Sequence, residues 1–269
     1  MKQLRIIFLL TILSMVGVNA LAYDAKIDDI YYNFSGTNAI VTYCGNNSTS
    51  NKYAYTGSVD IPKTVTYEGT TYSVTSISNE AFRWCSSLIS VNIPNSVTAI
   101  STYVFNDCSS LSTITIPNSV TSIGGSTFEG TPWYNNLSDG MIYAGKVAYK
   151  HKGTMPNNTN ITIVDGTVAI GEGAFYNCSN LVSIHIPNSV TTIGAYAFRD
   201  CSALTSIEIP YSVTDIGNSA FYCSRPQQLS IPYVMATEGD VNRLVGYNAG
   251  NIAAVGSHSF CVLGIQTKA

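Results

Sequence analysis

Histidine, cysteine and paired acids are the residue types in this 269-residue chain that could supply a base, a nucleophile or metal ligands. The three histidines, His151, His185 and His258, lie outside the Gly-x-Ser-x-Gly and His-Glu-x-x-His patterns of hydrolases and zinc enzymes. Asp28 and Asp29 are adjacent, so on a strand their carboxylates would point in opposite directions. The sequence also has no glycine-rich phosphate-binding loop. We therefore predict no catalytic residue, no cofactor and no enzymatic activity.

Most of the seven cysteines follow a repeated pattern, which indicates packing rather than chemistry. Cys85, Cys108, Cys178 and Cys201 each come three residues after a phenylalanine, and Cys223 comes one place early. This wide spacing, without a Cys-x-x-Cys pair, argues against a metal site. Two alternatives remain, a column of buried free thiols or disulfides between adjacent repeats. The regular phase favours free thiols, because a repeated cysteine behaves as a small apolar residue.

The elements that would hold these residues follow from an internal repeat of 23 residues. Within one unit, Ile207 and Ile209 alternate with polar residues as in a short strand, and Pro210 ends the strand because it lacks an N–H donor. A second extended piece follows in each unit, and we expect Gly194 to adopt a positive φ where the chain then bends. Phenylalanine marks the next turn and recurs in two runs: Phe82, Phe105 and Phe128, then Phe175, Phe198 and Phe221.

One such unit is too small to bury its own apolar side chains, so the units must stack. Stacking would pair each strand in parallel with its counterpart about 4.8 Å away and align Leu, Ile, Val and Phe in the interior. Each apolar side chain gains roughly 1.5 to 3 kcal/mol on full burial, most of it offset by chain entropy. The sequence therefore predicts a β-rich solenoid of short parallel strands, with short helical or irregular turns, over residues 61–232.

The repeats are flanked by other segments and interrupted twice. Residues 23–60 are rich in alternating tyrosines and predict a small β cap over the first unit. Longer spacings between repeat landmarks predict two inserted β-hairpins, near residues 65–74 and within residues 131–160. Such an insertion is either a plain decorating hairpin or a carrier of binding specificity. Residues 233–269 lose the repeat and are expected to form a C-terminal cap or a partly disordered tail.

Residues 1–22 have the features of a secretory signal peptide. Lys2 and Arg5 supply positive charge, residues 6–18 are apolar, and the Ala-Leu-Ala sequence at 20–22 is a small-x-small cleavage site. The alternative, a membrane anchor, needs about 20 apolar residues and no cleavage site. We predict a secreted or cell-surface protein that is not inserted in the membrane after cleavage.

Charge limits the classes of partner. The chain has 13 basic and 16 acidic residues, with a formal net charge of -3 at pH 7. Nucleic-acid binding needs clustered Lys and Arg to neutralise phosphates, and the sequence has no such cluster. We therefore expect no nucleic-acid partner.

Several units resemble a known family of repeats. The strings AFRWCSSLISVNIPNSVTAI and AFYNCSNLVSIHIPNSVTTIG combine Ala-Phe-x-x-Cys-Ser with Ile-Pro-Asn-Ser-Val-Thr. This signature is similar to the BspA-like leucine-rich repeats of bacterial cell-surface proteins, over about Ile61 to Pro232. The resemblance implies a leucine-rich-repeat fold and secretion or surface display. It also implies, since some members are adhesins, a binding role toward host extracellular proteins or other microbes.

Strand alternation selects a candidate binding surface. If the Leu and Ile residues of each strand point inward, the residues between them share one outward sheet face. We predict that this polar strip binds an extracellular protein or glycan. Alternatively, these are ordinary solvated strand residues of a structural surface or matrix component without a specific ligand. The sequence leaves open the partner's identity and the oligomeric state. The predicted strip consists of Ser90, Asn92, Thr113, Thr115, Ser183, His185, Ser206 and Glu208.

Overall fold

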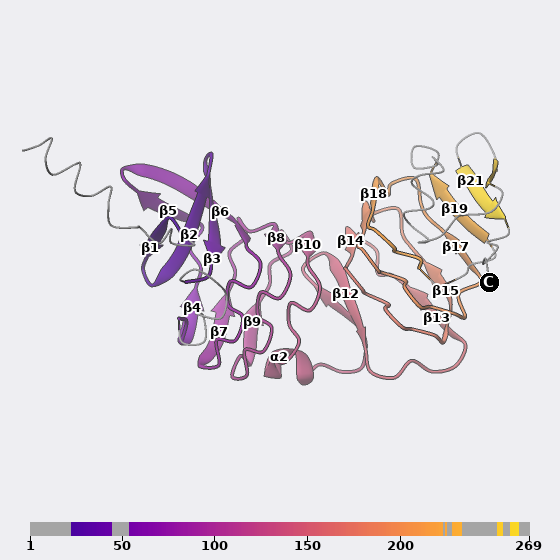
Figure 1. The fold of residues 1–269 in the computed structure, drawn as a ribbon, viewed down its shortest axis with the longest axis horizontal. Helices are drawn as coiled ribbons and strands as arrows, with labels where there is room; N and C mark the ends of the chain where they lie inside the picture. Colours follow the sequence, from indigo (N-terminus) through magenta and orange to yellow (C-terminus); the bar gives the residue numbers. More distant parts are fainter. Residues whose placement is uncertain are drawn as a thin grey trace, which may run out of the picture.

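The computed structural model describes residues 23–44, 54–222, 224, 228–232, 252–254 and 259–263. Figure 1 shows an elongated chain, in which antiparallel strands gather at the N-terminal end and parallel strands follow along its length. The predicted signal peptide and most of the segment 233–269 lie outside the described residues. The described part consists almost entirely of strands and turns.

The N-terminal sheet joins antiparallel strands to a parallel ladder. β1, β2 and β3 pair antiparallel in sequence order, and β5 and β6 pair antiparallel across a tight turn at Glu68 and Gly69. β3, β6, β8 and β10 then pair in parallel. The last three strands align Ser76, Ala99 and Ser122, each one repeat apart. The strands are β1 (Ala25–Ile27), β2 (Ile30–Ser35), β3 (Asn38–Thr42), β5 (Thr64–Tyr67), β6 (Thr70–Ile77), β8 (Ala99–Ile100) and β10 (Ser122–Ile123).

A second sheet of short strands repeats this arrangement further along the chain. β11 and β12 pair antiparallel, with a register shift between Ile142 and Tyr143. β12, β14, β16 and β18 pair in parallel. From β14 to β18 the register again advances by one repeat per strand, whereas the paired residues Val147 and Ala169 of β12 and β14 are one residue closer in sequence. The strands are β11 (Gly140–Ala144), β12 (Val147–Lys152), β14 (Ala169–Ile170), β16 (Thr192–Ile193) and β18 (Asp215–Ile216).

The remaining strands form three separate sheets. β4 pairs in parallel with β7 and β7 with β9, so β4 adds to this ladder although it lies within residues 23–60. β13 pairs in parallel with β15, while β17 pairs in parallel with β19. β19, β21 and β20 continue antiparallel. These strands are β4 (Gly57–Asp60), β7 (Leu88–Asn92), β9 (Thr113–Thr115), β13 (Thr159–Thr162), β15 (Leu181–His185), β17 (Ser206–Glu208), β19 (Gln228–Pro232), β20 (Ile252–Ala254) and β21 (Ser259–Leu263).

The one α-helix in the described part of the chain, α2 (Pro132–Asn135), lies where the repeats are interrupted. Thr131 caps its N-terminus, because the Thr131 side chain accepts a hydrogen bond from the Tyr134 N–H at 3.1 Å. Pro132 occupies the first turn, where a missing N–H costs nothing. The helix thus breaks the first run of strands between β10 and β11.

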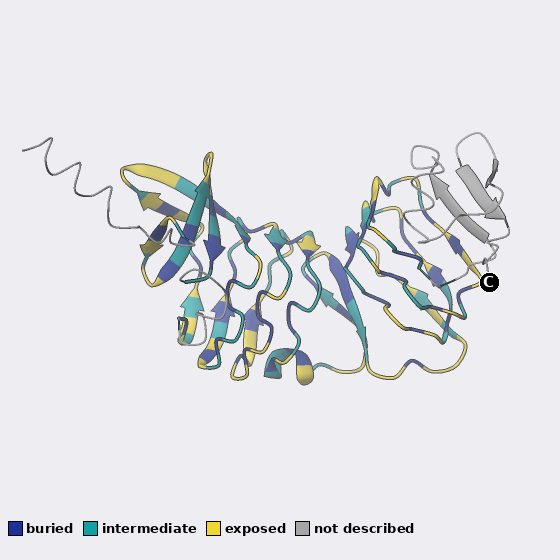
Figure 2. Cartoon of the chain, in the orientation of Figure 1, coloured by how far each residue is buried: buried dark blue, intermediate teal, exposed yellow. Residues whose placement is uncertain are grey.

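The core is a column of phenylalanine rings within each run of repeats. All six repeat phenylalanines are fully buried, and Figure 2 shows buried residues along most of the coloured strands. Ring centroids are 5.2 Å apart for Phe82 and Phe105, and 5.3 Å apart for Phe175 and Phe198. At the interruption, Phe128 meets Tyr149 at 5.0 Å instead of another phenylalanine. The inward positions predicted from the repeat are thereby confirmed.

The role expected for Gly194 is wrong. Gly194 is not among the residues with positive φ, and the left-handed conformation falls two residues later, at Tyr196 with φ 57°. A Cβ on Gly194 would lie 2.6 Å from the backbone nitrogen of Glu172 and 2.7 Å from the carbonyl carbon of Gly171. Glycine is therefore needed at this position because two successive repeats approach each other closely, not because the chain bends.

Candidate binding surface

The predicted strip residues point outward. Thr113 and Thr115 are exposed on either side of the buried Ile114 in β9. β17 has the same pattern around its buried isoleucine. Of the eight strip residues, Ser90 and Ser183 are half-buried and the other six are exposed. The alternation expected from the sequence holds, because each strand buries one side against the core.

The strip is divided into two parts along the chain, because α2 and the β11–β12 pair lie between β9 and β13. β4, β7 and β9 form one sheet, whereas in the second part β13 pairs with β15 and β17 belongs to another sheet, with β19. We call the residues on β4, β7 and β9 the N-terminal strip and those on β13, β15 and β17 the C-terminal strip. Sequence reasoning missed the strands β4 and β13, which lack the full repeat signature. The N-terminal strip is Ser58, Asp60, Ser90, Asn92, Thr113 and Thr115, and the C-terminal strip is Asn160, Thr162, Ser183, His185, Ser206 and Glu208.

Hydrogen bonds between neighbouring strands hold both strips in place. The Ser90 hydroxyl donates to the Ser58 hydroxyl oxygen at 2.8 Å, across the paired strands β7 and β4. The Ser183 hydroxyl donates to the side-chain oxygen of Asn160, across β15 and β13. Each strip therefore has part of its polar side chains already ordered, which lowers the entropy cost of binding a partner.

A hollow of about 520 Å³ lies over the C-terminal strip. His185 and Glu208 line it from β15 and β17, which gives the hollow one carboxylate and one imidazole. Tyr211, whose side chain is 66% exposed, lines its rim. Sequence reasoning missed Tyr211, although a signal was present: it stands where other repeats have the asparagine of Ile-Pro-Asn-Ser, as at Asn188.

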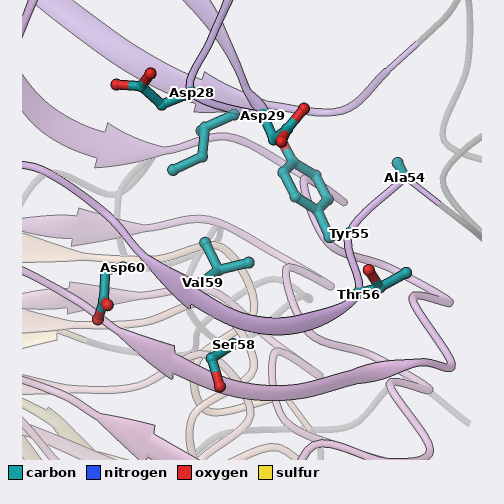
Figure 3. Close-up of a pocket in the computed structure, with 9 residues that line it drawn as sticks. Asp28, Asp29, Ala54, Tyr55, Thr56, Ser58, Val59 and Asp60 are labelled. Atoms are coloured by element: carbon teal, nitrogen blue, oxygen red, sulfur yellow. The ribbon is translucent and has the colours of Figure 1, made fainter.

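A second hollow of about 410 Å³ lies at the outer edge of β4, beside the N-terminal strip. Figure 3 shows Asp28 and Asp29 on one side of it and Ser58 and Asp60 on the other, with the ring of Tyr55 between. The Tyr55 hydroxyl donates to the carbonyl oxygen of residue 42 at 2.7 Å, and burial raises its pKa well above the ordinary value. The hollow is therefore lined by three acidic side chains, whereas the Tyr55 hydroxyl is bound to the backbone.

The carboxylates of this acidic hollow do not converge on one point. The Asp29 side chain pairs with the Lys26 amine at 2.7 Å, and this hydrogen bond lowers the pKa of the Asp29 carboxyl. Figure 3 shows the carboxyl groups of Asp28 and Asp60 directed apart. Among the residues that the structure describes, no three His, Cys, Asp or Glu side chains are grouped as metal ligands.

The cysteine column consists of buried free thiols. The Cys108 thiol donates to the Phe82 carbonyl oxygen at 2.9 Å, and the Cys201 thiol donates to the Phe175 carbonyl oxygen at 3.0 Å. In the next repeat the same bond is made by the Ser224 hydroxyl, which donates to the Phe198 carbonyl oxygen. The column position expected for Cys223 thus belongs to Ser224, and Cys223 lies outside the described residues.

Burial makes these thiols poor nucleophiles. It raises the pKa of Cys85 and Cys201 to about 12 and that of Cys178 to about 11. Burial also lowers the pKa of His151, although the negative charge of Asp139 acts to raise it. The four column thiols are therefore held in structural positions in the core.

Parallel strands in a fixed register, a buried phenylalanine column and almost no helix define a β-rich repeat protein of the leucine-rich type. A family model described as the BspA type leucine rich repeat region matches residues 49–150 and 147–240, in six copies. These matches cover more than half of the chain, and the chain belongs to this family.

Several solved structures are similar to this chain. A leucine-rich cell surface protein from Faecalibacterium prausnitzii is 26% identical over 76% of this chain and 52% of its own, with a TM-score of 0.41. A leucine-rich repeat protein from Bacteroides ovatus is 29% identical over 75% of this chain and 57% of its own, with a TM-score of 0.42. The leucine-rich repeat protein of T. pallidum is 22% identical over 82% of this chain and 95% of its own, with a TM-score of 0.41. The chain spans little more than half the length of the first two. A comparison with curated proteins finds no match.

None of the described helices combines the length and apolar character that crossing a bilayer would require.

Proposed function

We propose that this chain is a secreted or cell-surface binding protein, without enzymatic activity, that presents its two strips to an extracellular protein or glycan. The observation that supports this most directly is the pair of outward, hydrogen-bonded polar strips, each next to a hollow. Family membership supports the same role, and the Faecalibacterium prausnitzii relative is a cell surface protein. The signal peptide at residues 1–22 would deliver the chain to that location.

We infer that the repeats form one solenoid with two insertions. The constant register of the short strands supports this inference, since Ala169, Thr192 and Asp215 align in successive strands. The antiparallel pairing of β5 with β6 and of β11 with β12 supports the two insertions, and β1–β3 would cap the first repeat. A rigid frame of this kind suits binding, because surface residues repeat at fixed spacing and need little reordering.

A binding assay with strip variants tests the proposal. The full chain would be titrated onto surfaces coated with fibronectin, laminin or collagen, and onto bacterial surface extracts. The test variant carries Thr115→Ala, His185→Ala and Glu208→Gln. Each lost contact costs about 0.5 to 1.5 kcal/mol, so the three together should weaken saturable binding by about tenfold or more.

A control variant changes exposed residues outside both strips, on β10, on β18 and directly before β18. The control variant carries Ser122→Ala, Thr214→Ala and Asp215→Asn, which removes similar groups and one similar charge. Binding by this control should equal that of the unaltered chain. Equal weakening in both variants would show that the strips are not the binding surface. Self-assembly without binding to any coated surface would favour the structural matrix role instead.

A further inference from the structure

Three tyrosine rings surround Arg199 on the turns that close three successive repeats, and those of Tyr176 and Tyr196 are exposed. The guanidinium carbon of Arg199 lies 5.7 Å from the ring centroid of Tyr176 and 4.8 Å from that of Tyr222. Each of these three residues directly follows the buried phenylalanine of its repeat, so they form one column with Arg199 in the middle. The ring of Tyr196 lies 5.4 Å from the same carbon. We call Tyr176, Tyr196, Arg199 and Tyr222 the Tyr–Arg stack.

Backbone hydrogen bonds fix the turns that carry this stack. The Asn177 N–H donates to the Arg199 carbonyl oxygen at 2.8 Å, and the Asp200 N–H donates to the Tyr222 carbonyl oxygen at 2.9 Å. Backbone hydrogen bonds therefore hold successive turns in register, as they do for the paired strands. Rings within about 6 Å attract the guanidinium and limit its motion. Arg199 would consequently lose little conformational entropy when it binds a ligand.

The outer edge of the Arg199 guanidinium is available for a ligand. Its Nε donates to an Asp200 carboxylate oxygen at 3.3 Å. Nη1 and Nη2 make no hydrogen bond or ion pair to any residue in the described part of the chain. The side chain is 35% exposed, so these donors reach solvent. Two parallel N–H groups on a planar guanidinium match the two oxygens of a carboxylate.

A second arginine, at the same position of another repeat, has most of its donor groups bound within the protein. Arg83 directly follows Phe82, and its guanidinium carbon lies over the rings of Trp84 at 4.1 Å and Tyr103 at 4.8 Å. However, its Nη1 binds the Glu80 carboxylate and its Nε donates to the Asn106 side-chain oxygen at 3.2 Å. Arg83 is thus largely satisfied within the protein and provides a matched control for Arg199.

We propose that the Tyr–Arg stack binds a uronic-acid residue of an extracellular polysaccharide. The carboxylate would accept hydrogen bonds from Nη1 and Nη2 of Arg199. The C–H face of the sugar ring would pack on Tyr176, whose side chain is 51% exposed. An acidic peptide also offers a carboxylate, but it lacks a rigid ring with a C–H face for the tyrosines.

Fluorescence anisotropy of the full chain with labelled oligosaccharides tests this site. The probes are a short oligogalacturonide, a short hyaluronan oligomer, the methyl-esterified oligogalacturonide and a glutamate-rich peptide. We expect saturable binding of at least one carboxylated oligosaccharide, and the two probes distinguish galacturonate from glucuronate sources. Arg199→Gln and Arg199→Lys should each weaken that binding about tenfold or more, because both lose the paired donors. Arg83→Gln should leave it unchanged.

Several results would overturn the proposal. One is the absence of saturable binding to both carboxylated oligosaccharides, and another is binding of the methyl-esterified oligogalacturonide as tight as that of the free acid. A third is an equal loss of affinity in Arg83→Gln and Arg199→Gln. The last is binding of the glutamate-rich peptide as tight as that of the oligosaccharide. The Tyr–Arg stack shares no residue with either strip. The strip variant should therefore bind the oligosaccharide normally, so failure at the strips and failure at this site are separate results. Thermal melts of both Arg199 variants should match the unaltered chain.

Discussion

Replacing Phe198 with alanine tests the stacking of the repeats most directly. The Phe198 ring is fully buried between Phe175 and Phe221, with both centroid distances at 5.3 Å and interplanar angles of 4° and 2°. Phe198→Ala removes the middle of this column and leaves a cavity between two rings. Neither neighbour can close the cavity without breaking the backbone bonds that link successive turns, such as Phe198 N–H to the Ala220 carbonyl oxygen at 2.7 Å.

The expected loss of unfolding free energy follows from these contacts. A buried Phe→Ala change costs about 3 to 5 kcal/mol, and each aromatic pair contributes about 0.5 to 1.5 kcal/mol beyond area burial. Phe198 loses two pairs, so we expect a loss of about 4 to 5 kcal/mol. Among the described residues, Phe221 pairs only with Phe198. Phe221→Ala should therefore cost about 1 kcal/mol less.

Urea denaturation and amide hydrogen exchange measure these effects. In Phe198→Ala, the amides of Phe175 and Phe198 should exchange faster, because their acceptors lie on the disturbed turns. The Phe82 amide, which donates to the Val104 carbonyl oxygen in the other run of repeats, should keep its protection. A loss below about 1 kcal/mol, or faster exchange spread evenly over both runs, would refute stacking by nearest neighbours.

Three further predictions concern glycine and cysteine. Gly194→Ala should destabilise the chain by about 1 to 3 kcal/mol in urea denaturation, because its Cβ would meet the backbone of Glu172, and an unchanged midpoint would contradict this. Cys201→Ser should cost less than Cys201→Val in the same assay, because the hydroxyl keeps the bond that Ser224 makes one repeat later. Burial raises the pKa of Cys85 and Cys201 to about 12, whereas unfolded thiols ionise near 8.5. Stability from these thiols should therefore be complete below about pH 8 and fall as pH rises toward 12, and a denaturation midpoint that is flat over this range would contradict it.

The interruption between the two runs of repeats changes how the core is built. Phe128 ends the first column against Trp133 and Tyr149 rather than against the next phenylalanine. The Tyr149 hydroxyl also donates to a Glu129 carboxylate oxygen at 2.8 Å, which binds β12 to the end of the first run. The buried residues form two core clusters, and residues of the interruption belong to both, Tyr149 to the first and Ala148 to the second. The two strips lie on different sheets on either side of this interruption.

Much of the core could be predicted from the sequence. The 23-residue period placed Phe198 and Ile207 inside and Glu208 outside, because stacking repeats the same environment at each step. The wrong expectation for Gly194 has a general cause. A glycine in a sequence signals either a positive φ or a close approach, and the period alone does not distinguish the two.

The repeat, the inward positions of the repeat strands and the family could be read from the amino-acid sequence, since all three depend on side chains at fixed intervals along one chain. Which residues meet across the repeats became clear only from the fold. The interruption at α2 divides the strip, Asp28 and Asp60 line the same hollow from different segments, and Arg199 lies between two tyrosines. These features depend on distances between side chains in different repeats or outside them. Such distances are set by register and packing in three dimensions, which a one-dimensional pattern does not contain.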